Sequence, residues 1–261
     1  MKRSLAILSL VIATSLTAGA QSLCIRHSGE AIPARFGDQI DRTLLKEVEF
    51  YGPLLRQDTL NVNLQVFADN ETANAFIRQF EPTAYGNFCS GMYIPKIETA
   101  VLVASGDMEK AVKTLFHEMS HALYRSAIAS TYNAASLNEG LASYFEFMKV
   151  KKDGSISQKP DAIYINAMKT LVEIDEFNLS EYLKMNHRQF DDKSRHEGHA
   201  SYYASYVIVA TLFDKLGTER MRDLLEMICS GTSYEDAVEA LYPGGCGALD
   251  KDIRSFVLRN H

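Results

Sequence analysis

The spacing of apolar residues changes near Asp107, and no other feature of the sequence limits the fold as strongly. Before this point, apolar residues form two short runs typical of strands, at residues 62–66 and 99–104, and helical spacing at residues 41–55 and 70–80. After it, helical spacing continues almost to the C-terminus. The helices predicted there cover residues 109–126, 137–150, 160–177, 179–185, 200–216, 218–229 and 234–241. We therefore predict an α+β fold, with a small mixed N-terminal sheet and its helices followed by a mainly helical C-terminal part.

The composition is that of a compact domain rather than a disordered or fibrous chain. The 261 residues are 46% hydrophobic and 23% charged, so the chain can bury a sizeable core. Its 27 basic and 33 acidic residues give a net charge of −6, and there is no long basic run. A nucleic acid partner is not expected, because such a partner needs a basic surface.

The N-terminus has the order of a secretory signal peptide. Lys2 and Arg3 precede an apolar run from Leu5 to Ile12, and small residues follow as far as Ala20. The run is well short of the roughly 20 residues that span a bilayer, and no later stretch reaches that length. We predict a signal peptide over residues 1–20, export to the periplasm or the medium, and a mature protein without an integral membrane segment.

Four cysteines remain after cleavage, which predicts two disulfides in an exported chain. Three pairings are open from sequence alone. Proximity along the chain favours Cys229 with Cys246, which leaves Cys24 with Cys89. A cysteine zinc site is disfavoured, because the chain has no CxxC spacing.

Residues 117–121, His-Glu-Met-Ser-His, form an H-E-x-x-H motif inside the predicted helix 109–126. Four residues are just over one helical turn, so the imidazoles of His117 and His121 project to the same side and can bind one metal ion. Glu118 then lies beside the metal, where it can take a proton from a metal-bound water and deliver it to a leaving amine. The alternative is a chance spacing of two structural histidines.

A second motif follows in residues 137–146, Leu-Asn-Glu-Gly-Leu-Ala-Ser-Tyr-Phe-Glu. Together with H-E-x-x-H it resembles the gluzincins, zinc metallopeptidases with a downstream N-E-G-x-A-x-x-x-E segment, and secreted bacterial peptidase-MA-like proteins. The resemblance implies that Glu139 is the third ligand of one Zn²⁺ per chain, with Asn138 and Glu146 supporting the ligating histidines. The 17 residues between His121 and Glu139 are slightly fewer than in the best-known members. A solvent-exposed helix face is the alternative for Glu139.

The resemblance also implies a zincin-like domain over residues 21–261. An α/β lobe with the metal helix would cover residues 21–130 and a helical lobe residues 131–261, with the active-site helix at the cleft between them. Residues 99–105 would be the edge strand along which a substrate backbone binds.

Family members place a tyrosine before an apolar helix, where its hydroxyl donates to the oxyanion of the tetrahedral intermediate. Tyr202 fits this Y-x-x-[SG] pattern through Ser205, and Tyr203 is its rival. His196 and His199 are further candidates for a second donor. Packing or solvent-exposed roles are the alternatives for all four.

The function expected from these residues is an exported zinc-dependent peptidase, with water activated by Glu118 and a peptide or protein as substrate. Two alternatives stay open: an inactive peptidase-like module that binds peptides, and a zinc hydrolase that acts on a non-peptide amide or ester. The intact Glu118 argues against the inactive module. The oligomeric state is not predicted.

Overall fold

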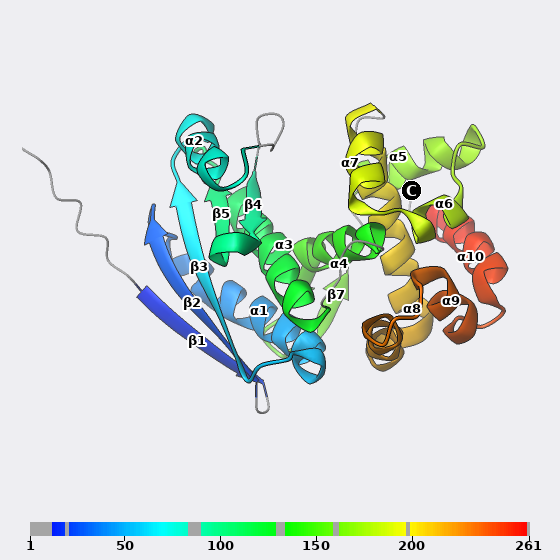
Figure 1. The fold of residues 1–261 in the computed structure, drawn as a ribbon, viewed down its shortest axis with the longest axis horizontal. Helices are drawn as coiled ribbons and strands as arrows, with labels where there is room; N and C mark the ends of the chain where they lie inside the picture. The colour runs from blue at the N-terminus through cyan, green and yellow to red at the C-terminus, as the bar shows by residue number, and fades with distance from the viewer. Residues whose placement is uncertain are drawn as a thin grey trace, which may run out of the picture.

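The computed structural model describes residues 12–18, 21–82, 90–128, 134–158, 162–196 and 199–259. A five-stranded sheet lies at one end of the molecule, with strand order β1-β2-β3-β5-β4 (Figure 1). Its strands are β1 (Ile12–Ala18), β2 (Gln21–Gly29), β3 (Thr59–Phe67), β4 (Gly91–Ile94) and β5 (Thr99–Val103). The central strands β2, β3 and β5 are parallel to one another, whereas β1 and β4 are antiparallel to their neighbours. β4 is therefore an edge strand, with no strand on its outer side in the described part of the chain.

Helices cover both faces of this sheet. Alternate residues of β5 belong to different cores: Ala100 and Leu102 pack with helices α1 (Gly37–Tyr51) and α3 (Met108–Ala127), and Val101 and Val103 pack with α2 (Asn70–Phe80). The two-residue period of a strand explains this division. Short 3-10 helices cover Ala34–Phe36, Gly52–Leu54 and Pro95–Ile97.

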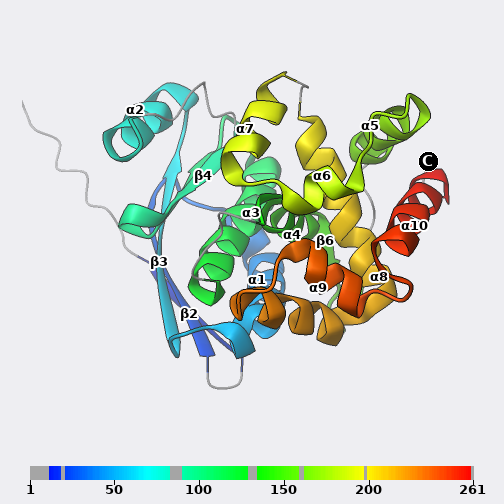
Figure 2. The ribbon, with the colours of Figure 1, turned by 45° about the vertical axis from the view of Figure 1, so that its right-hand side comes forward.

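The rest of the described chain is helical apart from one small hairpin. The hairpin pairs β6 (Met148–Val150) with β7 (Ile156–Gln158), so the loop predicted around residues 151–155 is its turn. A long helix, α8, runs through the helical part beside α4 (Figure 2). The helices are α4 (Ala135–Phe147), α5 (Ala162–Glu173), α6 (Leu179–Lys184), α7 (His187–His196), α8 (Ala200–Cys229), α9 (Tyr234–Leu241) and α10 (Gly245–Arg259).

The predicted α+β class is confirmed, and the differences are local. The helices predicted at 200–216 and 218–229 are both present: α8 consists of these two helical segments, which meet at a kink where Gly217 has non-helical backbone angles. The helix predicted at 137–150 ends at Phe147, because the next three residues pair in the hairpin. Strands β1 and β2 and helices α7 and α10 were not predicted. In α10 the buried residues Leu249, Ile253 and Val257 do recur at helical spacing, so the sequence contained a signal for this helix.

The prediction that residues 99–105 form the edge strand was wrong. β5 lies between β3 and β4, and all five of its residues are buried. β4 precedes it along the chain and supplies the edge, with α3 packed close by. Even where the sequence marks a run as a strand, it does not show the place of that strand in the sheet, because pairing between strands is a long-range choice.

The N-terminal segment adds a strand where a signal peptide is predicted. Residues 12–18 form β1, which pairs with β2 from Ile12↔His27 to Ala18↔Gln21. The signal peptide over residues 1–20 stays a prediction. None of the helices in the described part of the chain is both long enough and apolar enough to cross a bilayer.

The predicted pairing of Cys229 with Cys246 was wrong, because both are free thiols that face different elements. The thiol of Cys229 donates to the carbonyl of Ala127 on α3, and that of Cys246 donates to the carbonyl of Glu235 on α9. Cys24 is also a free thiol, and its predicted partner Cys89 lies outside the described residues.

Candidate active site

Helix α3 presents both histidines of the motif on one face. Asp107 starts the helix by accepting a hydrogen bond from the backbone N–H of Lys110, 3.0 Å away, as an N-cap residue does. The opposite face of the helix is buried in the main core and fixes the helix's rotation about its axis; this face includes Val112, Leu115, Phe116, Met119 and Leu123. The rings of His117 and His121 lie with their centroids 4.8 Å apart, nearly at right angles.

Glu139 on α4 brings a third ligand atom to the two imidazoles. Its Oε2 lies 3.4 Å from Nε2 of His117 and 3.5 Å from Nε2 of His121. A tetrahedral zinc site with ligands at about 2.0–2.2 Å has about 3.3–3.6 Å between ligand atoms. Oε2 of Glu139 is buried and accepts no well-formed hydrogen bond from the described residues, so it is available as a ligand. The three residues fit one zinc ion, with a side open to the cleft.

The remaining ring nitrogens are held by a carboxylate and an amide. Nδ1 of His117 lies 3.0 Å from Oε2 of Glu146, and Nδ1 of His121 lies 3.1 Å from Oδ1 of Asn138. Both partner oxygens accept hydrogen bonds, so each Nδ1 carries a hydrogen and donates it, and each Nε2 keeps its lone pair. This tautomer is the one that a metal ligand needs, and the predicted supporting residues Asn138 and Glu146 stand where they can enforce it.

The cluster is strongly coupled by charge. Burial lowers the pKa of His117, but the carboxylates of Glu139 and Glu146 raise it by more, so this pKa lies well above its usual value. Burial also lowers the pKa of His121, but the carboxylates of Glu139 and Glu118 together raise it by more, so this pKa too lies above its usual value. Burial raises the pKa of Glu139, yet the two imidazoles lower it by more, so this carboxylate stays ionised. Protons and a metal ion therefore compete for the same Nε2 atoms.

Glu118 lines the same cleft and is buried. Burial is the main cause that raises its pKa, and the nearby imidazoles oppose it. A carboxyl with a raised pKa suits a group that accepts and then returns a proton. Strand β4 approaches α3 closely here because residue 91 is glycine: a Cβ would lie 2.6 Å from Cγ2 of Thr114 and 3.3 Å from Oε1 of Glu118.

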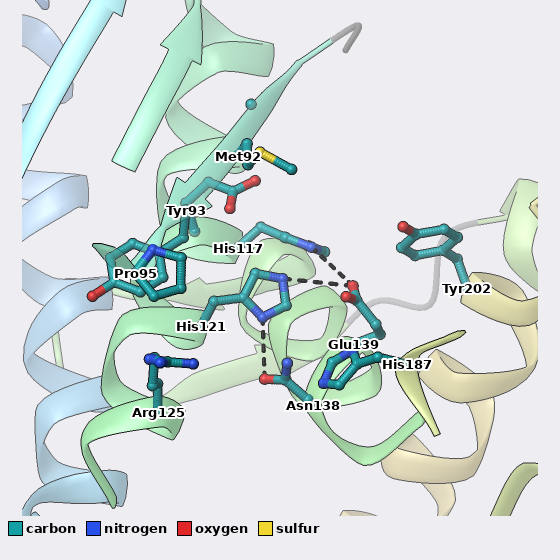
Figure 3. Close-up of a pocket in the computed structure, with 12 residues that line it drawn as sticks. Met92, Tyr93, Pro95, His117, His121, Arg125, Asn138, Glu139, His187 and Tyr202 are labelled. Atoms are coloured by element: carbon teal, nitrogen blue, oxygen red, sulfur yellow. Dashed lines mark hydrogen bonds and ion pairs between the residues drawn. The ribbon is translucent and has the colours of Figure 1, made fainter. Parts of the chain in front are cut away.

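Tyr202, on the first turn of α8, faces the metal ligands from the other side of the cleft (Figure 3). The charge of Glu139, followed by burial, holds the pKa of its hydroxyl well above the usual value, so the hydroxyl remains a donor. Its rival Tyr203 instead packs edge-on against Tyr164, with 4.8 Å between ring centroids. Neither His199, the N-cap residue of α8, nor His196, whose Nδ1 bonds to the carbonyl of Asp192, lines the cleft.

The cleft has a volume of about 290 Å³. Some of its lining residues were not predicted, namely Gly91, Met92, Tyr93, Pro95, Arg125 and His187. Arg125 did have a signal, because it follows His121 by four residues on the same helix face. His187 on α7 had none, since only the folding of the helical part brings it to the cleft.

The sequence of most of the chain matches the family model described as the peptidase MA superfamily, over residues 83–259. The chain belongs to the peptidase MA superfamily. The resemblance to gluzincin peptidases seen in the two motifs is therefore confirmed, and so is the zincin-like fold.

Solved structures share the fold of this peptidase MA superfamily member at low identity. An M1 zinc metallopeptidase mutant from Deinococcus radiodurans, bound to a Tyr-Ser-Ala substrate, is 13% identical with a TM-score of 0.52, over 94% of this chain and 50% of that chain. An aminopeptidase N family protein from Idiomarina loihiensis is 14% identical with a TM-score of 0.55, over 94% and 46%. The chain thus spans about half the length of these proteins. No curated protein matches the sequence.

Proposed function

We propose that the chain is a zinc-dependent peptidase that hydrolyses peptide bonds with Glu118 as the general base. The observation that carries the proposal is the convergence of the ligand atoms of His117, His121 and Glu139, with 3.4 and 3.5 Å between the carboxylate and the imidazoles. Membership of the peptidase MA superfamily supports it. So does the free edge of β4 beside the cleft, since such an edge can bind an extended peptide by backbone hydrogen bonds.

His117, His121 and Glu139 would hold the zinc ion. When bound, the ion supplies Lewis acidity, which lowers the pKa of a water ligand to about 7 and polarises the substrate carbonyl. Glu118 accepts the proton of the attacking water and delivers it to the leaving amine. Tyr202 donates its hydroxyl proton in a hydrogen bond to the oxyanion of the tetrahedral intermediate. Glu146 and Asn138 keep the imidazoles in the ligating tautomer.

Zinc content and turnover of a Glu118→Gln variant test the proposal together. We expect about one zinc per chain in both proteins. The wild type should cleave peptides from a random mixture, and the variant should cleave them about 10²- to 10⁴-fold more slowly. Ester and non-peptide amide substrates, assayed in parallel, distinguish a peptidase from another zinc hydrolase. A chain that purifies without zinc under mild conditions, or a variant as active as the wild type, would contradict the mechanism.

Export is a separate part of the proposal and rests on the N-terminal pattern of residues 1–20. Cleavage after Ala20 removes β1 and leaves β2 at that edge of the sheet. The mass of the protein recovered from an expressing bacterial host tests this, because the mature form begins at Gln21. Full-length protein retained in the cytosol would contradict it.

A further inference from the structure

One end of the cleft carries a positive charge that the proposed mechanism does not use. Arg125 lies one helical turn beyond His121 on α3 and lines the cleft together with Tyr93 and Pro95. Its guanidinium forms no ion pair with any carboxylate of the described residues, and its side chain is exposed. Figure 3 shows Arg125 and Pro95 on one side of the metal ligands and Tyr202 on the other.

The negative charges of the cleft are all at the metal centre. Among the described residues, the carboxylates that line it are Glu118 and Glu139. Glu98 lies near enough to raise the pKa of Tyr93, an effect that Arg125 opposes, but Glu98 is exposed and does not line the cleft. Among the described residues that line the cleft, the end at Arg125 therefore has a cation and no carboxylate.

The direction of β4 shows which part of a bound peptide meets Arg125. β4 runs from Gly91 to Ile94, and its outer edge has no strand partner among the described residues. A peptide added to this edge pairs most favourably in the antiparallel sense, so it runs from Ile94 towards Gly91. Its residues on the N-terminal side of the cleaved bond then lie beside Pro95 and Arg125.

We propose that Arg125 makes the cleft select peptides with an acidic side chain on the N-terminal side of the cleaved bond and reject a free amino terminus there. This inference rests on the proposed peptidase function and names its substrate class: internal, acidic stretches of polypeptide. A guanidinium binds a carboxylate through two parallel hydrogen bonds, whereas it repels an α-ammonium group. The same cation that attracts an acidic side chain thus disfavours aminopeptidase action.

The test uses N-acetylated peptides that differ only in Glu, Gln or Lys before the cleaved bond, and the same peptides with a free amino terminus. We expect kcat/KM to be on the order of fivefold higher for the Glu peptide than for the Gln peptide, and lowest for the Lys peptide. The ratio of Glu to Gln should decrease with added salt. In Arg125→Gln the ratio of Glu to Gln falls to about one. Lys110→Gln, which removes the same charge elsewhere on α3, keeps the wild-type ratio.

Binding of the same peptides to zinc-loaded Glu118→Gln separates this inference from the proposed function. If no peptide is cleaved but Arg125 still determines a preference for Glu in binding, the inference holds and the peptidase function fails. If peptides are cleaved with equal preference for Glu and Gln, or best from a free amino terminus, the function holds and the inference fails. An unchanged ratio in Arg125→Gln also overturns it.

Discussion

Replacing Gly140 by alanine should weaken the contact between the two helices that position Glu139 and Tyr202. Gly140 is buried on α4 against α8. A Cβ at this position would lie 2.4 Å from the carbonyl oxygen of Ser205 and 2.5 Å from Cγ2 of Val209, where ordinary contacts begin at 3.4 Å. The valine can rotate, but the carbonyl is part of α8, so the helices must separate by about 1 Å.

Two effects of known size oppose each other in this variant. Alanine favours a helix over glycine by about 1 kcal/mol. Overpacking a close contact costs about 1–3 kcal/mol, and a clash with backbone belongs at the upper end because no rotamer relieves it. We therefore expect the free energy of unfolding of Gly140→Ala to fall by about 1–2 kcal/mol. Gly247 on α10 is the matched control, since nothing lies within 4 Å of its Cβ. Gly247→Ala should gain up to about 1 kcal/mol.

Urea unfolding of both variants measures the stability change, and zinc affinity and kcat measure its effect on the site. A displacement of about 1 Å in a catalytic group costs on the order of 10²-fold in rate, so kcat should fall by more than stability alone explains. If Gly140→Ala is as stable as Gly247→Ala, the close approach of α4 and α8 does not constrain this position, and the reasoning is wrong.

Three further predictions concern single side chains. Tyr202→Phe should lower kcat by about 10²- to 10³-fold with unchanged zinc content, and an unchanged rate would exclude it as the oxyanion donor. Glu146→Ala should weaken zinc binding about 10- to 100-fold at pH 8 in chelator competition. The carboxylate of Glu146 also raises the pKa of His117 and so favours the proton that competes with zinc. The difference in zinc affinity between the wild type and the variant should therefore be smaller at pH 6 than at pH 8. Glu47 is buried with neither oxygen hydrogen-bonded to a described residue, and burial raises its pKa well above the usual value. Above about pH 4.3, the Glu47 carboxyl loses its proton in the unfolded chain but keeps it in the folded metal-free chain. The free energy of unfolding therefore falls as the pH rises above this value. Glu47→Met should thus stabilise the chain more at pH 8 than at pH 5 in denaturant unfolding, and equal gains would contradict this.

The metal ligands could be predicted from sequence because local geometry fixes their relation. In any α-helix, residues four apart face the same side, so His117 and His121 required only that residues 108–127 be helical. Glu139 came from a motif within a second helix, and its own spacing to Glu146 places both carboxylates on one side of α4. The contact between α3 and α4, by contrast, depends on tertiary packing. The family resemblance implied this contact, whereas local periodicity could not predict it.

Residues that are close along this chain are not always close in space, and two predictions are wrong for that reason. Cys229 and Cys246 are 17 residues apart, but α9 intervenes and each thiol bonds to a different helix. Strand β5 looked like the edge strand because it directly precedes the metal helix, whereas β4 folds back outside it. In both cases the outcome depends on which distant segment is the partner. The sequence of the segment itself does not specify that partner.

Helix packing determines which of Tyr202 and Tyr203 faces the metal ligands. Adjacent residues of a helix point about 100° apart, so only one of the two can face α4. Ser205 and Val209 of α8 meet Gly140 of α4, and residue 202 precedes Ser205 by three, which places it on nearly the same face. The glycine that lets the helices touch therefore also sets the rotation of α8 and directs the Tyr202 hydroxyl towards the metal ligands. It follows that a larger residue at position 140 should impair the function of Tyr202 without changing the tyrosine itself.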